Sequence, residues 1–559
     1  MVEGEGHLDI VKTKISLSKL VFSGGGTVDL GSSEILVVVG PNNAGKSQLL
    51  RDIQSLFQLE SHHSYVGKVV KGIEVASPSA GDVWADMQAY QENGTEFYSS
   101  MGVRVHKNYV HNAFAVGVNP IKFGPASQFF LKRISPDERL AIVQPSPALG
   151  ANGPETPGQI LYDNEVILNR VSKLFRKSFG KDLFLDYRAG STIPIYVGDK
   201  PKIPKKCDRI SDQYVQLVRA NDLLHEQGDG MKSFGGIMLS MLAAYNITLV
   251  DEPEAFLHPP QERAIGKFIA EEAGGQVICS THSKSVLQGI LQSSKLSVRV
   301  GRLIRENNKN YLHEISPEEI STLWKDPIFR YSTALEALFH DRAILCEADP
   351  DCRFYEAVEG VIRPDHGPDN HYIPCGGKAS YPKFIKALRK LSVPVLAILD
   401  LDVLNDEANI KAIYEAQGGS WDEISQLWKR LDAAIRKGVA IDDVPGIKKK
   451  ISGELDAWTD GPAPVSKIMD ILNLRKPWGK IKEGGVNSFP VGDAQKASGQ
   501  LINKLAEYNV FPVPVGTLEK FVRPVGNHGN KWLNAVFEAY DLSDPELRDA
   551  REFMERVLT

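Results

Sequence analysis

Two aspartates separated by one leucine end an otherwise apolar run, "PVLAILDLD" at residues 394–402. Side chains two residues apart on a strand point to the same face, so the carboxylates of Asp400 and Asp402 are expected to lie side by side. Like charges at that distance repel unless a cation lies between them. The run therefore predicts a divalent-metal site at the end of a buried strand, with an aspartate-rich exit into a loop as the structural alternative.

Two further carboxylates, Glu347 and Asp351, follow the earlier apolar run "RAILC". The C-terminal ends of parallel strands meet at one edge of a sheet, so we expect all four carboxylates to converge there. Hard oxygen ligands select Mg²⁺ or Mn²⁺, and two such ions can hold the attacking and leaving oxygens of a phosphodiester. The pattern favours metal-assisted cleavage of a phosphodiester.

A second set of residues is suited to nucleotide binding. The stretch "GPNNAGKS" follows the apolar run "EILVVV" and precedes a helical pattern, which is the context that a phosphate-binding loop requires. Gly40 and Gly45 let backbone N–H groups close around phosphates, Lys46 would reach the β- and γ-phosphates, and Ser47 would bind Mg²⁺. The other residues expected at this nucleotide site are Asn42, Asn43 and Gln48.

Two later strand-like runs deliver residues that complete an ATP-hydrolysing site. "NITLVDEPEAFLHPP" contains Asp251, expected to hold the nucleotide's Mg²⁺, and Glu252, expected to orient or deprotonate the attacking water. "GGQVICSTHS" places His282 at the end of a strand, where an imidazole could contact a γ-phosphate. A histidine at a strand end is more often structural, but the order of the three motifs favours a site.

The order of "GPNNAGKS", "KSFGGIMLSMLAA", "LVDEPEAFLHP" and "STHS" resembles the ABC-type ATPases of SMC-like and overcoming-lysogenization-defect (OLD) proteins. The resemblance implies a signature segment, with Ser233, Gly235 and Gly236, that reaches the partner subunit's γ-phosphate across an ATP-sandwich dimer. Phe234 departs from the family's Leu-Ser-Gly-Gly order, and a turn before a helix is the alternative for this segment. The implied assembly is a homodimer or a higher homo-oligomer through the ATPase domain.

The later motifs "CEADPD", "CGGK" and "DLD" resemble a TOPRIM domain, as found in topoisomerases, primases and OLD-type nucleases. Ala348 stands where the family commonly has glycine. The resemblance implies that Glu347 and Asp400 are metal ligands and that Asp402 and Asp351 serve a second metal or support the first. It also implies an additional ligand, Glu519 in "GTLEKFV", and a lysine at the scissile phosphate, Lys531 in "NHGNKWLNAV" with Lys520 as the rival.

These elements predict an α/β protein of two domains. An ABC-type P-loop ATPase domain is expected at residues 1–338, with an insertion at about 60–225 that lacks the heptads of a coiled-coil arm. A TOPRIM domain is expected at 339–559, with a helical insertion at about 404–508. That insertion carries the basic stretches "GIKKK" and "NLRKPWGKIK", in which Trp478, Arg475, Lys476, Lys480 and Lys482 are either a nucleic-acid contact or ordinary surface residues.

Composition excludes several classes of protein. The chain has 559 residues, a net charge of −5 and five cysteines without CxxC spacing, which argues against a disulfide framework, a zinc site or a global basic field. It has neither a run of eighteen apolar residues nor an N-terminus like a signal peptide, so we expect a cytoplasmic protein that does not span a membrane.

Together, the two resemblances imply an ATP-regulated, Mg²⁺-dependent endonuclease that cleaves DNA, with Mn²⁺ as the alternative ion at the nuclease site. Families with this layout commonly act in bacterial antiviral defence, so a regulatory partner, protein or nucleic acid, is expected. A topoisomerase or primase is disfavoured because no segment supplies a nucleophilic-tyrosine or zinc module. The non-enzymatic alternative is an ATP-driven sensor or scaffold whose TOPRIM site binds nucleic acid without cutting it.

Overall fold

The computed structural model describes most of the chain, and its contacts divide it into two compact units, Met1–Arg330 and Tyr331–Thr559. The predicted domain boundary after residue 338 stays a prediction. No helix within the described residues is long and apolar enough to cross a membrane. All five cysteines are free thiols. The described residues are 8–9, 14–59, 64–92, 94–114, 123–150, 153–293, 296–316, 318, 325, 333–364, 367–438, 444–459, 463–473 and 478–559.

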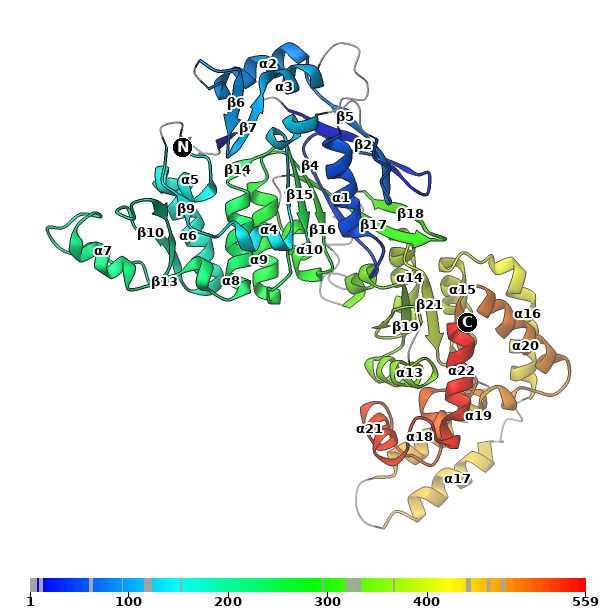
Figure 1. The fold of residues 1–559 in the computed structure, drawn as a ribbon. Helices are drawn as coiled ribbons and strands as arrows, with labels where there is room; N and C mark the ends of the chain where they lie inside the picture. Colours follow the sequence, from blue (N-terminus) through cyan, green and yellow to red (C-terminus); the bar gives the residue numbers. More distant parts are fainter. Residues whose placement is uncertain are drawn as a thin grey trace. The chain divides into compact units, whose positions relative to one another are not determined.

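A six-stranded sheet forms the centre of the first unit (Figure 1). Its strands are parallel except for the edge strand β18, which is antiparallel to β17. The three apolar runs of the nucleotide motifs are its central strands, and they are buried throughout, as is typical of a parallel sheet covered on both faces. The strand order is β18 (Lys309–Ile315), β17 (Ser297–Glu306), β4 (Glu34–Val39), β16 (Gln276–Ser280), β15 (Ile247–Asp251) and β8 (Leu131–Ile134).

Helix α1 (Lys46–Phe57) starts directly after the loop that follows β4. Its apolar side, including Leu49 and Ile53, packs in one buried cluster with Leu36 and Val38 of β4. A small antiparallel sheet of β3 (Thr27–Asp29), β2 (Ser16–Phe22) and β5 (Val70–Ala76) adds to the same cluster. The helices α8 (Asp229–Ser240), α9 (Pro259–Glu272) and α10 (Lys284–Leu291) complete the elements around the nucleotide motifs.

Part of the segment predicted as an insertion belongs to the main sheet. Strand β8 pairs in parallel with β15, in register Leu131 with Ile247. It is followed by the short helix α4 (Pro136–Ala141), which carries the buried Arg139. The range of about 60–225 therefore contains an edge strand of the ATPase sheet as well as peripheral elements.

The second unit contains a four-stranded parallel sheet, and its core includes residues of α13 (Asp349–Ile362) and α22 (Arg548–Leu558). Helix α14 (Tyr381–Lys390) connects the second and third strands along the chain. Because the strands are parallel, their C-terminal ends share one edge. The strand order is β20 (Asn370–Pro374), β19 (Arg342–Cys346), β21 (Val395–Leu399) and β22 (Val510–Pro512).

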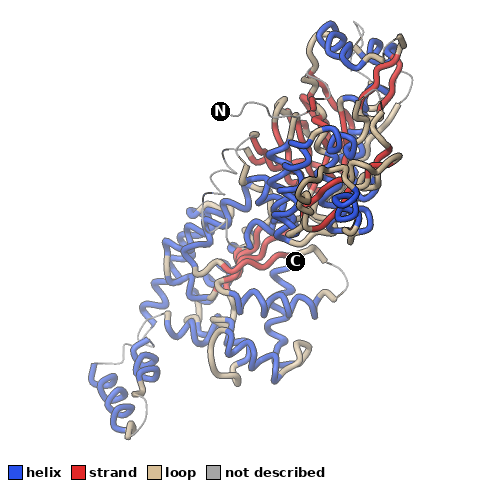
Figure 2. The backbone as a smooth tube through the Cα atoms, turned by 90° about the vertical axis from the view of Figure 1, so that its left-hand side faces the viewer, coloured by secondary structure: helices blue, strands red, loops and turns tan. Residues whose placement is uncertain are grey.

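The segment between β21 and β22 is helical in its described part. Helices α17 and α18 form a pair at the periphery of this unit (Figure 2). The predicted residues Arg475 and Lys476 lie outside the described residues. The helices are α15 (Glu407–Ala416), α16 (Trp421–Gly438), α17 (Val444–Asp456), α18 (Val465–Asn473), α19 (Gly479–Gly484) and α20 (Asp493–Glu507).

Candidate nucleotide and metal sites

The phosphate-binding loop has the backbone geometry that its glycines allow. Gly40 and Gly45 have φ of 145° and 95°, and a Cβ on Gly40 would lie 2.2 Å from the carbonyl oxygen of Leu303. The ammonium of Lys46 donates to the carbonyl oxygens of Gly40 at 2.7 Å and Pro41 at 2.8 Å. Burial lowers the pKa of Lys46 to about 8, although Glu252 and Glu254 oppose the shift. The Lys46 side chain thus folds back onto the phosphate-binding loop, where its ammonium bonds backbone carbonyl oxygens.

A cavity of about 380 Å³ lies at this loop and brings together most of the residues predicted to bind nucleotide. Asp251, which the sequence predicts as a magnesium ligand, is not among the lining residues. The cavity is lined by Asn42, Asn43, Gly45, Lys46, Ser47, Gln48, Glu252 and His282.

Asp251 is 3 % exposed and its carboxylate is already engaged. One oxygen accepts a hydrogen bond from Ser280 at 2.8 Å, and the other is paired with Arg133 at 3.1 Å. Both partners stand on strands that flank β15, at the same edge of the sheet. These two contacts fix the Asp251 carboxylate at the end of β15. The next residue in the chain, Glu252, lines the cavity.

His282 and Glu252 lie on the same side of the cavity, with His282 Nε2 3.7 Å from a carboxylate oxygen of Glu252. Burial and the nearby Lys46 lower the pKa of His282 to about 4, so its imidazole is neutral at pH 7. A neutral imidazole can exchange hydrogen bonds with a phosphate or a water but does not supply a positive charge. The lysine is consequently the cation of this cavity.

Glu254 is a residue that the sequence analysis does not identify. Its carboxylate accepts hydrogen bonds from the Thr281 hydroxyl at 2.8 Å and from the backbone N–H of His282. Burial raises the pKa of Glu254 to about 7. Glu254 thus links the ends of β15 and β16. In the sequence, its position two residues after Glu252 was the feature that could have identified it.

The residues of the signature segment that the resemblance implies lie within helix α8. Ser233 and Gly235 lie inside α8 and are buried, and the Ser233 hydroxyl donates to the carbonyl oxygen of Ala255 at 3.0 Å. Gly236 is also buried, and a Cβ there would lie 2.0 Å from the carbonyl oxygen of Arg139. These small residues allow α8 to pack closely. The exposed residues at the start of α8 are Gly228 and Asp229, five and four positions earlier than Ser233.

In the second unit, three of the predicted carboxylates converge. Glu347, Asp400 and Asp402 each offer an oxygen, and these oxygens all lie within 4.8 Å of one another. Glu347 follows β19 and Asp400 follows β21, the neighbouring strand. The backbone N–H of Asp400 donates to a carboxylate oxygen of Glu347 at 3.0 Å. This set of oxygen donors fits a Mg²⁺ or Mn²⁺ ion.

Asp351 lies near the group but is not one of its three members. It caps the start of α13, where its carboxylate accepts the N–H of Ala348 at 3.2 Å. Burial and the charge of Glu347 raise the pKa of Asp351 to about 7, and burial together with Glu347 does the same for Asp400. Ala348 has φ of −142°, which any residue adopts, so the glycine common in TOPRIM domains is not required here.

Two lysines that the sequence analysis does not assign to the site hold these carboxylates. Lys378 is bonded to Asp402 and lies 3.6 Å from Glu347, and Lys482 donates to the other oxygen of Asp402 at 3.1 Å. Lys378 follows Gly376 and Gly377, whose positive φ values turn the chain after β20 towards this edge. A lysine after two glycines at a strand end was the available signal for it.

The other predicted residues are not part of the three-carboxylate group. Glu519 accepts hydrogen bonds from Thr517 at 2.9 Å and from the Gly529 N–H at 3.2 Å. Burial favours its neutral form, but hydrogen bonds from its own N–H and that of Gly529 outweigh this and lower the pKa of Glu519. Lys520 is paired with Glu483 at 2.6 Å. Lys531 is exposed in the first turn of α21 (Asn530–Ala539).

Comparison with known families adds an independent observation. Residues 200–288 match the model of an AAA domain described as "putative AbiEii toxin, Type IV TA system", and residues 338–402 match the OLD-like TOPRIM domain, "overcoming lysogenization defect protein-like". The first match contains Asp251, Glu252 and His282, and the second contains Glu347 and both aspartates. In this chain, a match to an ATPase domain is thus followed by a match to an OLD-like TOPRIM domain. Domains of these two kinds imply the use of a nucleotide and of a divalent metal.

Among the solved structures that the chain matches are SMC head domains. The chain is 13 % identical to an SMC head bound to the C-terminal winged-helix domain of ScpA, with 55 % of this chain and 99 % of that one covered and a TM-score of 0.34. It is 15 % identical to the SMC head domain from Thermotoga maritima, with 54 % and 99 % covered and a TM-score of 0.29. No curated protein matches this chain.

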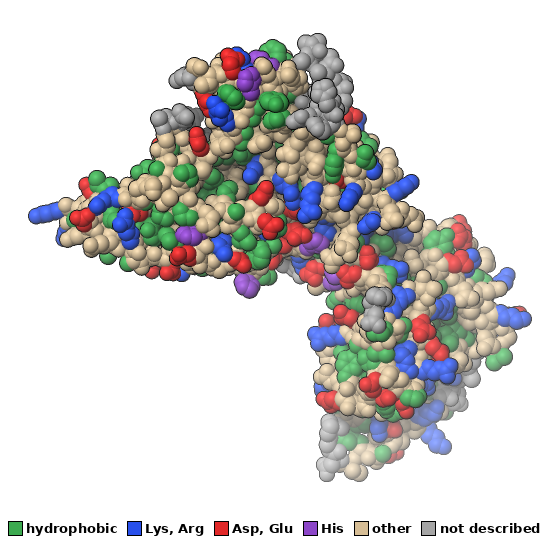
Figure 3. Space-filling model, in the orientation of Figure 1, with side chains coloured by type: hydrophobic (Ala, Val, Ile, Leu, Met, Phe, Trp, Pro, Cys, Tyr) green, Lys and Arg blue, Asp and Glu red, His purple; other side chains and the backbone are tan. Residues whose placement is uncertain are grey.

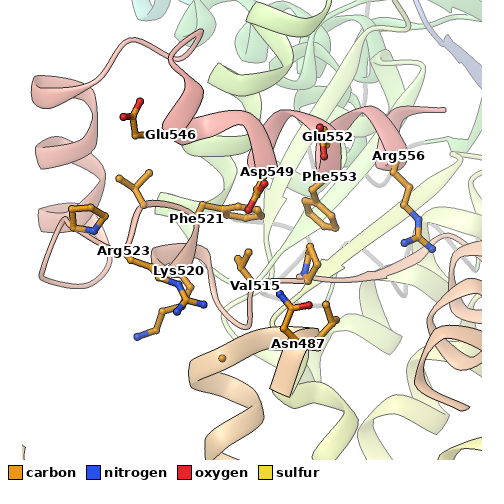
Figure 4. A pocket seen from close by; sticks show the side chains of 15 residues that line it. Asn487, Val515, Lys520, Phe521, Arg523, Glu546, Asp549, Glu552, Phe553 and Arg556 are labelled. Atoms are coloured by element: carbon orange, nitrogen blue, oxygen red, sulfur yellow. The ribbon is translucent and has the colours of Figure 1, made fainter. Parts of the chain in front are cut away.

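A cavity of about 570 Å³ lies in the second unit, and Lys520, the alternative catalytic lysine, is among its lining residues (Figure 4). Its walls come from the end of α19, the segment after β22 and helix α22. Lys520 and Arg523 line one side, whereas Asp549, Glu552 and Arg556 all project from α22. On the face drawn in Figure 3, basic and acidic side chains are likewise interspersed over each unit. A charged ligand would therefore be held by local groups rather than by a field of one sign.

Proposed function

We propose that this protein is an ATP-binding and ATP-hydrolysing, Mg²⁺-dependent endonuclease that cleaves DNA. The observation that supports the nuclease most directly is the group of Glu347, Asp400 and Asp402, whose oxygens lie within 4.8 Å of one another at the end of two adjacent TOPRIM strands. A metal ion held there supplies positive charge to the phosphodiester oxygens. The nucleotide cavity belongs to the other unit, so the two activities are separable.

At the nuclease site, each residue has a distinct proposed role. Glu347 and Asp400 hold the metal, and Asp402 and Asp351 hold a second ion or support the first. Lys531 acts as the cation beside the scissile phosphate, and Glu519 is an additional ligand. Glu519 and Lys531 are near each other in the chain fold, since Gly529, at the start of the same helix, donates its N–H to Glu519.

In the ATPase unit, Lys46 binds the β- and γ-phosphates, Ser47 and Asp251 hold the nucleotide's Mg²⁺, and Glu252 orients the attacking water. His282 lies within reach of Glu252 and lines the same cavity, which supports a role at the γ-phosphate. The proposed assembly is a homodimer or larger oligomer through this unit. The proposed contact with the partner subunit is the segment of α8 that contains Ser233 and Gly235, which the exposed start of the helix adjoins.

The proposed biological role is that of an effector in bacterial antiviral defence, controlled by a partner protein or nucleic acid. The resemblance to OLD-type proteins and the toxin named by the first matched family support this role. The alternative is an ATP-driven sensor that binds nucleic acid without cutting it. In that case the same nucleotide-cavity and carboxylate residues would bind their ligands without catalysing DNA cleavage.

The decisive experiment measures two activities in the same preparations. Purified protein is incubated with plasmid DNA and Mg²⁺ or Mn²⁺, with and without ATP, and ATP turnover is measured in parallel. Glu347→Ala and Asp400→Ala should each reduce DNA cleavage at least about a hundredfold while ATP turnover persists. If the intact protein and its complexes with cellular partners cut no nucleic acid, the sensor role replaces the nuclease role.

A further inference from the structure

A lysine of the helical insertion reaches into the acidic site of the second unit. Lys482, in α19, donates a hydrogen bond from Nζ to Asp402 at 3.1 Å across a separation of 80 residues. The opposite oxygen of Asp402 accepts a hydrogen bond from Lys378. The sequence left open whether Lys482 contacts nucleic acid or is an ordinary surface lysine. Its position shows that it belongs to the carboxylate site.

Main-chain contacts hold Lys482 beside the aspartates. A Cβ added to Gly516 would lie 2.0 Å from the carbonyl oxygen of Lys482, so the two backbones touch. The carbonyl oxygen of Gly516 accepts a hydrogen bond at 2.8 Å from the N–H of Leu401, which stands between Asp400 and Asp402. Lys482 is therefore positioned by the same turn that presents the metal ligands.

Buried side chains anchor α19 on either side of this contact. Trp478 is 2 % exposed, and its indole N–H donates to Asp432 of α16 at 2.9 Å. Ile481 is also buried, and beyond the helix the N–H of Val486 donates to the carbonyl oxygen of Pro514 at 2.8 Å. The insertion is thus joined to the edge of the sheet at the point where Lys482 enters the site.

The two lysines at Asp402 differ in exposure. The Lys378 side chain is 20 % exposed and is paired with both Asp402 and Glu347, whereas the Lys482 side chain is 45 % exposed and is paired with Asp402 alone. An incoming phosphate arrives from solvent and needs a cation that solvent can reach. Lys378 is suited to neutralise the carboxylates permanently, and Lys482 is suited to contact a ligand.

We propose that Lys482 binds a phosphate oxygen of the nucleic acid at the TOPRIM site, so that the helical insertion contributes a substrate-binding residue. The inference rests on the proposed function for the identity of the ligand, but it does not require the site to cut. It leaves Lys531 as the cation proposed for the cleavage step. Lys482 instead holds the backbone of the nucleic acid next to the carboxylates.

The test compares Lys482→Gln with Lys480→Gln, a matched control on the same helix with an exposed side chain. Binding of a labelled duplex DNA is measured over a range of salt concentrations, with Ca²⁺ as the divalent ion. Lys482→Gln should weaken binding about tenfold at low salt and reduce the slope of log affinity against log salt by about one. Lys482→Arg, which keeps the charge, should bind within about threefold of the unmodified protein.

Each outcome has a distinct meaning. Equal DNA binding by the two glutamine variants would overturn the role of Lys482, whether or not the protein cleaves DNA. Loss of Mn²⁺ binding in Lys482→Gln, measured by electron paramagnetic resonance, would also overturn it, because the lysine would then be supporting the carboxylates alone. Selective loss of DNA binding in a protein that never cuts would retain the inference and reject the nuclease function.

Discussion

The guanidinium of Arg139 donates a hydrogen bond at 2.8 Å to the backbone carbonyl oxygen of Glu252, the residue proposed to orient the attacking water. It also donates to the carbonyl oxygen of Asp251 at 3.1 Å. Glu252 has φ of 45°, a conformation that residues other than glycine rarely adopt. A buried arginine from the segment after β8 thus stabilises the turn that directs Glu252 into the cavity.

Replacing Arg139 by Met should slow ATP hydrolysis more than it weakens nucleotide binding. Arg139 contacts the Asp251–Glu252 turn but does not line the cavity, so its loss should displace the glutamate and leave the phosphate-binding loop in place. We expect turnover to fall at least about tenfold, as small displacements of catalytic groups do. Turnover is measured beside nucleotide affinity and melting temperature. If the folded variant hydrolysed ATP at the wild-type rate, Arg139 would contribute to packing but not to the positioning of Glu252.

Because Gly236 lies in close contact with Arg139, alanine at position 236 should lower the free energy of unfolding, whereas alanine at an uncrowded helical glycine should not. Gly236→Ala would place a methyl group 2.0 Å from the Arg139 carbonyl oxygen, so we expect a loss of about 1–3 kcal/mol of unfolding free energy. Gly453→Ala, in α17, meets nothing within 4 Å and should be stabilising or neutral, because alanine favours helix by about 0.8–1 kcal/mol over glycine. Denaturant unfolding of the two variants checks both signs. Equal effects would contradict the packing assigned to α8.

Substitutions in the nucleotide cavity should separate binding from hydrolysis. Lys46→Ala removes the cation that faces the phosphates and should abolish ATP turnover together with tight binding. Glu252→Gln keeps the size of the side chain and should retain ATP while reducing turnover at least about a hundredfold. Light scattering of Glu252→Gln with ATP should report a dimer or larger assembly. Undiminished hydrolysis by both variants would contradict the site.

Nucleotide affinity should fall as the pH rises through about 8. Burial lowers the pKa of Lys46 to about 8, so the fraction of ammonium decreases from pH 7 to pH 9 and the attraction for phosphates decreases with it. Because phosphate oxygens favour the charged form, binding at pH 8 should take up protons from the buffer. Calorimetry in two buffers with different ionisation enthalpies measures that uptake. Identical heats in both buffers would mean that Lys46 is already fully charged.

The sequence predicted the strands and the residues at their ends well, because both depend on short local patterns. The apolar runs before Gly40, Asp251 and Asp400 are central strands, and an α/β fold follows from them. The three carboxylates converge because parallel strands end at a common edge. An extended strand predicts that Asp400 and Asp402 point to the same face. In the structure the strand ends at Leu399, and Asp402 stands in a short 3₁₀ helix.

Contacts between distant segments could not be predicted in the same way. Arg139 belongs to no motif, and the basic stretch that contains Lys482 does not indicate the carboxylate that it contacts. Both contacts join residues far apart in the sequence and become apparent only in the fold. The burial of Ser233 could not be predicted for a related reason. The pattern "SFGG" has the composition of a loop before a helix, but α8 starts at Asp229, and its small residues are required by the close approach of α4.

The hydrogen bond from the Asp400 amide to Glu347 allows ion binding at the acidic site to be detected by amide exchange. An ion bound by Glu347 withdraws electron density from the same carboxylate that accepts this amide proton. Hydrogen–deuterium exchange in the peptide containing Asp400 would therefore respond to ion uptake without any substrate present. Ion loading could be followed in this way in variants that are unable to cut or to hydrolyse ATP.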